Sequence, residues 1–239
     1  MPNIIKLDEV DSTNSYMKAH LSKLCDGDVV TARLQTAGRG RLGHEWAADE
    51  GMLPLSILLK NPPERENITA RVGLAVCEAL KELGEISAFI KWPNDIIIGS
   101  RKVCGILCES AAFGDNFCVI VGIGVNVSQT AEFFENAKLP NAASLLMLTG
   151  KAPERETLTE KIAERVKLRA AASFAECYDE YKPRVINLGR QVRIISTKGE
   201  KLAEAVDISE SGFLVCRDES GTFEVSSGEV SIRGANGYF

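Results

Sequence analysis

The sequence is poor in the residues that build metal centres. It has two histidines, His20 and His44, and none of its seven cysteines forms a C-x-x-C pair. Zinc sites generally need four Cys or His ligands in closely spaced pairs. We therefore expect no side-chain metal cluster, and we interpret the odd number of cysteines as reduced, buried thiols of a cytoplasmic protein.

Long apolar runs and an excess of positive charge are also missing. No apolar run approaches the ~20 residues that a membrane helix needs, and the first residues, MPNIIKLDEVDST, contain no apolar signal segment. The formal net charge is -5, whereas DNA-binding domains generally carry a basic surface. We therefore expect a cytoplasmic protein that binds neither membranes nor DNA.

The 239 residues, with 45% hydrophobic and 26% charged side chains, have the composition of a globular protein. After Pro183, five short strand-like runs follow one another, separated by Gly, Ser and Lys. This pattern is typical of a small all-β barrel. Before Pro183, strands mix with helices, and short links force antiparallel neighbours. We predict an α+β domain over residues 1–184 and a β-barrel domain over residues 185–239.

Hydrophobic periodicity predicts the elements of the first domain. Apolar residues recurring at helical spacing predict helices after residues 11–13, over 64–83 and over about 155–181. Apolar runs bounded by turn residues predict strands at 28–35, 52–60, 86–92, 95–98, 102–110 and 117–127. The strands form a mixed, largely antiparallel sheet in this interpretation.

Residues 36–46, TAGRGRLGHEW, contain three glycines spaced as G-x-G-x-x-G. A dinucleotide site needs a helix directly after such a turn, and an acidic residue about 20 positions further on. The residues that follow include Gly51 and Pro54, show no helical period, and offer no acidic residue at that distance. We therefore reject the dinucleotide-binding interpretation.

The same stretch instead resembles a flexible cationic loop. Glycine lets the backbone adopt conformations closed to other residues, and Arg39 and Arg41 flank Gly40 with planar donors suited to carboxylate or phosphate oxygens. We expect such a loop to become ordered when an anion binds. For an isolated R-G-R, a solvated surface loop is the more common explanation.

Residues 91–109, KWPNDIIIGSRKVCGILCE, place charged residues in otherwise apolar strands. A two-residue turn at Gly99-Ser100 would pair Asp95 with Cys104 and put Asp95 and Lys102 on one face, roughly 7 Å apart. These two side chains would then face one pocket with room for a ligand between them. A simple surface ion pair is the alternative, and the residues themselves leave both open.

Asn126 lies within the apolar run VIVGIGVNV, which predicts burial. A buried Asn needs hydrogen-bond partners, either from the backbone or from a ligand. Gly122 and Gly124 leave room beside this strand for a planar group.

Five blocks together resemble the biotin protein ligases: DSTN (11–14), QTAGRGRLGHEW (35–46), KWPNDI (91–96), RKVCGILCE (101–109) and VGIGVNV (121–127). They occur in that family's order and approximate spacing. The resemblance implies a class II synthetase-like biotin/lipoate ligase catalytic domain followed by an SH3-like β-barrel. Larger family members carry an N-terminal helix-turn-helix domain, for which the residues before position 11 leave no room. We therefore expect the short form, which does not bind DNA.

The resemblance implies the activity of a biotin–[biotin carboxyl-carrier protein] ligase. Biotin's carboxylate attacks the α-phosphorus of MgATP, which gives biotinyl-5'-AMP and pyrophosphate. A lysine amine of the acceptor then attacks the acyl carbonyl and releases AMP. The acceptor is the biotin carboxyl carrier domain of a biotin-dependent carboxylase, and the enzyme is expected to be a homodimer.

The resemblance also assigns the site residues. Arg41 and Lys102 contact the carboxylate and the α-phosphate and, with Asp95 as organiser of the reacting centre, form the catalytic set. The biotin-binding residues are Ser12, Thr13, Asn14, Gln35, Gly38, Arg39, Gly40, Arg41, Lys102 and Gly105. The residues that bind ATP or the adenylate are Arg39, Arg41, Trp46, Asn94, Lys102, Asn126 and Arg233.

Two departures and two alternatives accompany the resemblance. The family often has Arg at the positions of Leu42 and His44, so the chain is expected to hold phosphate or adenylate less firmly. A lipoate–protein ligase or octanoyltransferase shares the catalytic fold, although GRGRLG and KWPND favour biotin. A sensor or adaptor that kept the pocket and lost the chemistry is the non-enzyme alternative.

Overall fold

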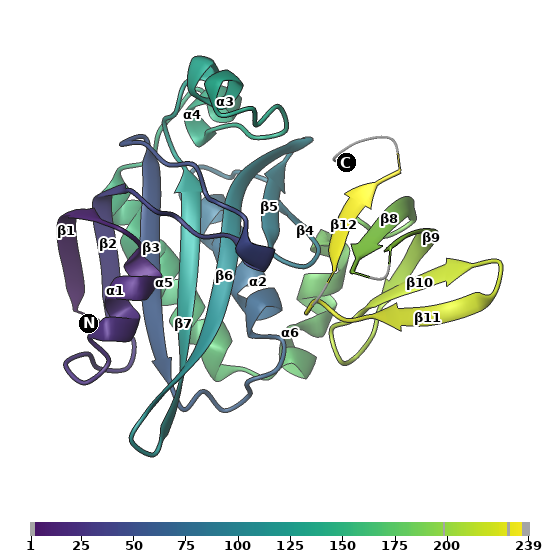
Figure 1. Cartoon of the computed structure of the whole chain (residues 1–239), viewed down its shortest axis with the longest axis horizontal. Coiled ribbons are helices and arrows are strands. Elements are labelled where there is room, and N and C mark those ends of the chain that lie inside the picture. Colours follow the sequence, from purple (N-terminus) through teal and green to yellow (C-terminus); the bar gives the residue numbers. More distant parts are fainter. Residues whose placement is uncertain (1–2, 198, 229, 236–239) are drawn as a thin grey trace.

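A seven-stranded sheet forms the larger part of the computed structural model (Figure 1), which describes residues 3–197, 199–228 and 230–235. Its strand order is β1-β2-β3-β7-β6-β5-β4. β1 runs parallel to β2, and the other neighbours are antiparallel. The strands are β1 (Ile4–Val10), β2 (Val29–Gln35), β3 (Met52–Lys60), β4 (Phe89–Lys91), β5 (Asp95–Ile98), β6 (Arg101–Phe113) and β7 (Asn116–Asn126). The predicted mixed, largely antiparallel sheet is confirmed.

Helices cover both faces of this sheet, because side chains of the central strands alternate between two apolar cores. Leu55 and Ile57 of β3 belong to the larger core, which contains α2 (Ile68–Glu82) and α5 (Arg155–Ala171). Leu58 belongs to a second core around α1 (Thr13–Ala19). In Figure 1, α1 accordingly lies in front of the sheet, and α2 and α5 lie behind it.

The predicted helix over residues 155–181 is wrong, because it is two helices. α5 ends at Ala171, and α6 (Phe174–Tyr181) begins after Ser173. Ser173 accepts a hydrogen bond from the Glu176 amide, and the Glu176 carboxylate accepts from the Ser173 amide. This reciprocal capping box starts a new helix. The S-x-x-E signal was present in the sequence.

Two other element boundaries differ from the prediction. The helix expected from residue 64 begins only at Ile68, because buried Arg71 donates hydrogen bonds to the carbonyls of Glu64 and Glu66 and holds them outside the helix. The strand expected over 86–92 is limited to Phe89–Lys91. Two short helices, α3 (Ala131–Asn136) and α4 (Leu145–Thr149), follow β7. None of the described helices combines the length and apolarity needed to span a bilayer.

The C-terminal part is a five-stranded antiparallel sheet with the order β11-β10-β9-β8-β12. Its strands are β8 (Arg190–Ser196), β9 (Gly199–Ile208), β10 (Leu214–Asp218), β11 (Gly221–Val225) and β12 (Ser231–Gly234). The five predicted strands are therefore present, and the small all-β unit is confirmed. The division at residues 184 and 185 stays a prediction.

The C-terminal sheet is anchored beside β4 at one end of the large sheet. Trp92 Nε1 donates a hydrogen bond to the Gly212 carbonyl at 3.2 Å. The Tyr178 hydroxyl of α6 donates to the Ile208 carbonyl at 2.5 Å. Both donors lie in the first part and both acceptors in the second, so β12 is held close to the KWPND segment (Figure 1).

Candidate active site

A cavity of about 580 Å³ opens between the large sheet, the loop after β2 and β12. Its size lies within the range of about 300–1,000 Å³ that is typical of small-ligand pockets. Gly38 and Asn126, although both are described residues, lie outside its lining. The other residues that the sequence assigns to the site all line it: Ser12, Thr13, Asn14, Gln35, Arg39, Gly40, Arg41, Trp46, Asn94, Asp95, Lys102, Gly105 and Arg233.

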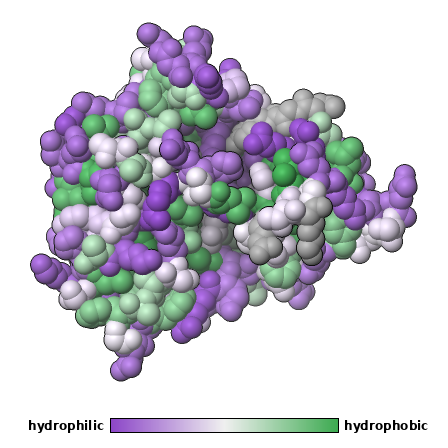
Figure 2. Space-filling model, in the orientation of Figure 1, coloured by the Kyte–Doolittle hydropathy of each residue, from purple (hydrophilic) through white to green (hydrophobic). Residues whose placement is uncertain are grey.

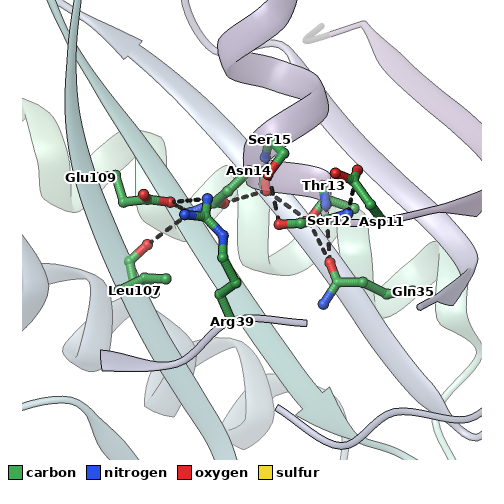
Figure 3. A network of polar contacts seen from close by, with 10 residues as sticks. Asp11, Ser12, Thr13, Asn14, Ser15, Gln35, Arg39, Leu107 and Glu109 are labelled. Atoms are coloured by element: carbon green, nitrogen blue, oxygen red, sulfur yellow. Dashed lines mark hydrogen bonds and ion pairs between the residues drawn. The ribbon is translucent and has the colours of Figure 1, made fainter. Parts of the chain in front are cut away.

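A polar network forms one end of the cavity (Figure 3). Ser12 caps α1, which presents the Thr13 amide and hydroxyl to Gln35 Oε1 at 2.9 and 3.3 Å. Asn14 Nδ2 donates to Glu109 Oε2 at 2.7 Å. Buried Ser56, from the middle of β3, lies within 2.8 Å of Thr13 Oγ1 and 2.6 Å of Asn14 Oδ1. These contacts fix amide and hydroxyl groups around the DSTN segment.

The cationic loop folds over the cavity and is tied at two points. Arg39 forms an ion pair of 2.9 Å with Glu109 of β6. Arg41 Nη1 donates to Asn94 Oδ1 at 3.1 Å, and its Nη2 donates to the carbonyls of Ser227 and Val230, which lie between β11 and β12. Burial lowers the pKa of the Arg41 guanidinium, and the nearby carboxylate of Asp95 partly opposes this effect. The loop thus joins the two parts of the chain across the cavity.

The turn at the tip of this loop has a conformation that is unusual for its residue. Leu42 has a φ of 55°, in the left-handed region, and is 55% exposed. A side chain in this region generally costs about 1 kcal/mol or more relative to glycine.

Asp95, Lys91 and Lys102 form what we term the Lys–Asp–Lys cluster. Asp95 is buried, and its Oδ1 lies 2.6 Å from Lys102 Nζ, while its Oδ2 lies 3.6 Å from Lys91 Nζ. The two side chains are therefore in direct contact, and the room for a ligand that was expected between them is absent. Both the pocket and the ion-pair interpretations are partly right, because the paired side chains also line the cavity.

The register of this hairpin differs from the prediction. Ile97 pairs with Lys102 as expected, but Asp95 pairs with Gly105 and not with Cys104. Val103 is an extra residue in β6, a β-bulge that shifts the pairing by one position. The alternation of side chains along one strand does not reveal this bulge.

Trp46 packs on the floor of the cavity over two glycines. A Cβ at Gly105 would lie 2.4 Å from Trp46 Cζ3, and one at Gly124 would lie 2.9 Å from its indole. Gly38, which is not part of the cavity lining, lies against the backbone of the same residue, since a Cβ there would lie 2.5 Å from the Trp46 carbonyl oxygen. Lys102 Nζ lies 4.8 Å from the centre of the indole ring. Trp46 Nε1 is buried and has no hydrogen-bond partner among the described residues.

Asn126 is hydrogen-bonded to protein groups in this structure. Its Nδ2 donates to the carbonyls of Lys102 and Ala143 at 3.4 and 3.2 Å, and its Oδ1 accepts from Gln129 at 3.3 Å. These contacts hold the segment after α3 beside Lys102, so they favour the backbone alternative. The contact of Asn126 with adenine stays a prediction.

Lys91 and Glu109 belong to the site but were not assigned from the sequence. Lys91 lines the cavity with an almost fully buried side chain, and burial lowers its pKa to about 8 against the opposing effect of Asp95. Glu109 holds Arg39 and Asn14. The only sequence signal for either residue is a charged side chain in an apolar strand.

Family models match both parts of the chain. The model of the biotin/lipoate A/B protein ligase family matches residues 7–126, and that of the biotin protein ligase C-terminal domain matches residues 188–233. The fold and the cavity therefore define a ligase of the biotin/lipoate class.

Similar proteins narrow this class. A biotin–[acetyl-CoA-carboxylase] ligase of Mycobacterium tuberculosis is 31% identical over 93% of this chain and 86% of its own length. The bifunctional ligase/repressor BirA of Salmonella typhimurium is 29% identical over 98% of this chain and 75% of its own length. A biotin protein ligase from Aquifex aeolicus, solved with biotin and ATP, has a TM-score of 0.85 and 34% identity and covers 98% of this chain and 100% of its own. The chain belongs to the biotin protein ligase family.

Proposed function

We propose that this protein activates biotin with ATP as biotinyl-5'-AMP and transfers the biotinyl group to one lysine of a biotin carboxyl carrier domain. The observation that carries the proposal is the convergence of the DSTN, GRGRLG, KWPND and RKVCG segments on one cavity. Family membership gives the chemistry, and the cavity supplies groups suited to each part of the two substrates.

The polar end of the cavity suits the ureido ring of biotin. A ureido group offers one carbonyl acceptor and two N–H donors, and the Thr13 hydroxyl and the Gln35 side chain supply both kinds of partner. Ser12 and Asn14 border the same end, and Gly105 lies on the floor beneath the Trp46 indole. Biotin would therefore lie with its ureido ring near α1 and its carboxylate toward Lys102.

The cationic side of the cavity suits the reacting anions. A carboxylate approaching a triphosphate is repelled, and fixed positive charge in a site shielded from water lowers this barrier. Arg41 and Lys102 would neutralise the carboxylate and the α-phosphate, with Arg39 and Arg233 available to the remaining phosphates. Trp46 and Asn126 would hold the adenine, and Asn94 would contact the adenylate beside Arg41.

Magnesium is expected to accompany ATP. Within residues 3–197, 199–228 and 230–235, no three His, Cys, Asp or Glu side chains gather to hold a metal ion. Mg²⁺ usually keeps several waters and binds substrate phosphates, so it does not need a protein cage. When bound, the ion supplies charge neutralisation on the phosphates.

The second step needs an uncharged acceptor amine close to the acyl carbon. The amine nitrogen forms the new bond to that carbon and gives up one proton to solvent, the bond from carbon to the phosphate oxygen breaks, and AMP leaves with the electron pair of that bond. Asp95, which lines the cavity, would organise the incoming lysine. The cationic loop would cover the adenylate until the acceptor docks, because the mixed anhydride hydrolyses in water.

The proposal is tested by incubating a carrier domain with this protein, biotin and MgATP, followed by mass spectrometry. We expect one biotinyl group on one lysine and none when ATP is omitted. Thermal shift separates biotin from lipoate, because a ligand at 100 times its Kd stabilises by about 2.7 kcal/mol. Stabilisation by lipoate or octanoate alone, with an unmodified carrier domain, would contradict the proposal.

We also propose that the enzyme is a cytoplasmic homodimer. All seven cysteines are free thiols, as the reducing cytoplasm favours. The dimer rests on the family resemblance, and analytical ultracentrifugation tests it. A sedimentation mass equal to one chain at micromolar concentration would contradict it.

A further inference from the structure

The Lys–Asp–Lys cluster places two ammonium groups on one buried carboxylate. Lys102 touches Asp95 at 2.6 Å, whereas Lys91 stands 3.6 Å away on the other carboxylate oxygen. The side chains of Lys91 and Asp95 are 7% and 11% exposed, and that of Lys102 is 23% exposed. Both lysines line the cavity, but Lys102 is the more accessible partner and Lys91 is the more deeply buried one.

The proposed function makes conflicting demands on Lys102. To neutralise the biotin carboxylate and the α-phosphate, its ammonium has to turn from Asp95 toward these anions. Removing one partner from a buried charge is strongly unfavourable, because the charge left behind is neither solvated nor paired. A second cation on the other oxygen of Asp95 lowers this cost and so weakens the hold of Asp95 on Lys102.

We propose that Lys91 is a positioning residue that keeps Asp95 charge-balanced while Lys102 turns to the reacting anions. This inference rests on the proposed function and adds a residue to it. The gap of 3.6 Å leaves Lys91 room to close on Asp95, since a charge-assisted N–H···O contact is about 2.7–2.9 Å long. Lys91 acts through Asp95 and Lys102 and is not itself a catalytic residue.

The position of Lys91 in the fold suits this role. It is the last residue of β4 and pairs with Asp95, the first residue of β5, across the hairpin. A salt bridge with no functional role could stand on the surface, where it would lose little solvation. Burying an ammonium group beside the cavity costs free energy. The buried position of Lys91 therefore favours a role in the site over a purely structural salt bridge.

Among the described residues, charged groups from several strands act on the Lys91 ammonium, and they include Asp95 from β5, Lys102 from β6 and Arg233 from β12. Burial lowers the Lys91 pKa most, Lys102 and Arg233 lower it further, and Asp95 raises it, with a result of about 8. As pH rises through about 8, Lys91 loses its charge and Asp95 retains Lys102. Adenylation should therefore slow over this range.

The test measures kcat/KM for biotin in biotin-dependent pyrophosphate–ATP exchange, which reports the free enzyme's titrating groups. Lys91→Met keeps an unbranched side chain, shorter by one atom, and removes its charge. We expect a rate lower by about tenfold or more, as for other residues that orient a catalytic group, and no decline near pH 8. Lys91→Arg should recover much of the rate and also lose this decline, because a guanidinium stays protonated.

Two further variants show whether Lys91 acts through Asp95. In an Asp95→Asn background, Lys91→Met should change the rate little, because the charge that Lys91 balances is gone. Lys6→Met, at an exposed lysine paired with Glu156, should leave both rate and pH profile unchanged. Melting temperatures of all variants check folding.

The inference is overturned if both Lys91 variants keep the wild-type decline, or if Lys91→Met lowers the rate equally in the two backgrounds. The second result would mean direct contact with substrate or a general structural role. Failure of the wild-type protein to catalyse any biotin-dependent exchange would instead contradict the proposed function. The two failures are therefore distinguishable.

Discussion

At the scale of single residues, the cations of the site are held by protein oxygens that anionic substrates would have to replace. Lys102 is paired with Asp95, Arg39 with Glu109, and Arg41 with Asn94 and two backbone carbonyls. Such contacts orient the cations before the reaction. On the proposed function, we expect each cation to change partner when a substrate binds.

Replacing the central cations tests their assigned roles. Arg41→Ala or Lys102→Ala should lower the single-turnover rate of biotinyl-5'-AMP formation by about 10²–10³, as for other residues that stabilise developing charge. Folding should persist, because Asp95 keeps Lys91 when Lys102 is removed. Lys6→Ala is the matched control. Near-normal rates in both site variants would refute the assignment.

The glycine beneath Trp46 gives a steric test of the floor. Gly105→Ala would place a methyl carbon 2.4 Å from the indole ring, so the ring or the strand has to move. Overpacking of this kind costs about 1–3 kcal/mol. We expect biotin affinity, measured by calorimetry, to fall by about tenfold.

Gly84→Ala is the control for this test, because a Cβ there meets only Ile86 at 3.8 Å. It should bind biotin like the wild type. An unchanged Kd in Gly105→Ala would show that biotin does not use this floor.

At the scale of elements, the strands were easier to predict than the helix ends. The apolar runs of β3 and β7 continue over nine and eleven residues. Both the apolar pattern and the length of each run therefore predict a strand. The break between α5 and α6 depends on one capping interaction at Ser173. The bulge at Val103 depends on how β6 pairs with β5, which alternation within one strand does not report.

The capping box has a measurable contribution. Ser173→Ala removes the side chain that accepts from the Glu176 amide at 3.3 Å. It should lower the free energy of unfolding by about 1 kcal/mol, measured by urea denaturation, with an unchanged adenylation rate. Ser211→Ala, at an exposed turn residue, is the control. Equal stability of the two variants would contradict the role of Ser173.

At the scale of the whole molecule, the cavity is completed by both parts of the chain. Val230, Ser231 and Arg233 line it from the C-terminal part, and Arg41 reaches that part from the loop after β2. Figure 2 shows hydrophilic residues over the α3 region and the tip of the β10–β11 hairpin, with hydrophobic residues in smaller patches between them. The sequence predicted the two parts, whereas their meeting at the cavity followed only from the family resemblance.

Closure of the loop should be visible by limited proteolysis. Trypsin is expected to cleave after Arg39 or Arg41 in the protein alone. Biotin and MgATP together should slow this cleavage by about tenfold, because protection follows the population of the open loop. Other sites in the same digest provide the control. Equal cleavage with and without substrates would show that the loop does not close over them.

The central claim is that one cavity joins biotin to the α-phosphate of ATP. The most direct measurement incubates the protein with biotin, Mg²⁺ and ATP labelled at the α-phosphate, without a carrier domain. We expect about one bound biotinyl-5'-AMP per site with an equal release of pyrophosphate, and discharge of the label as AMP once a carrier domain is added. No biotin-dependent release of pyrophosphate and no bound adenylate would contradict the claim.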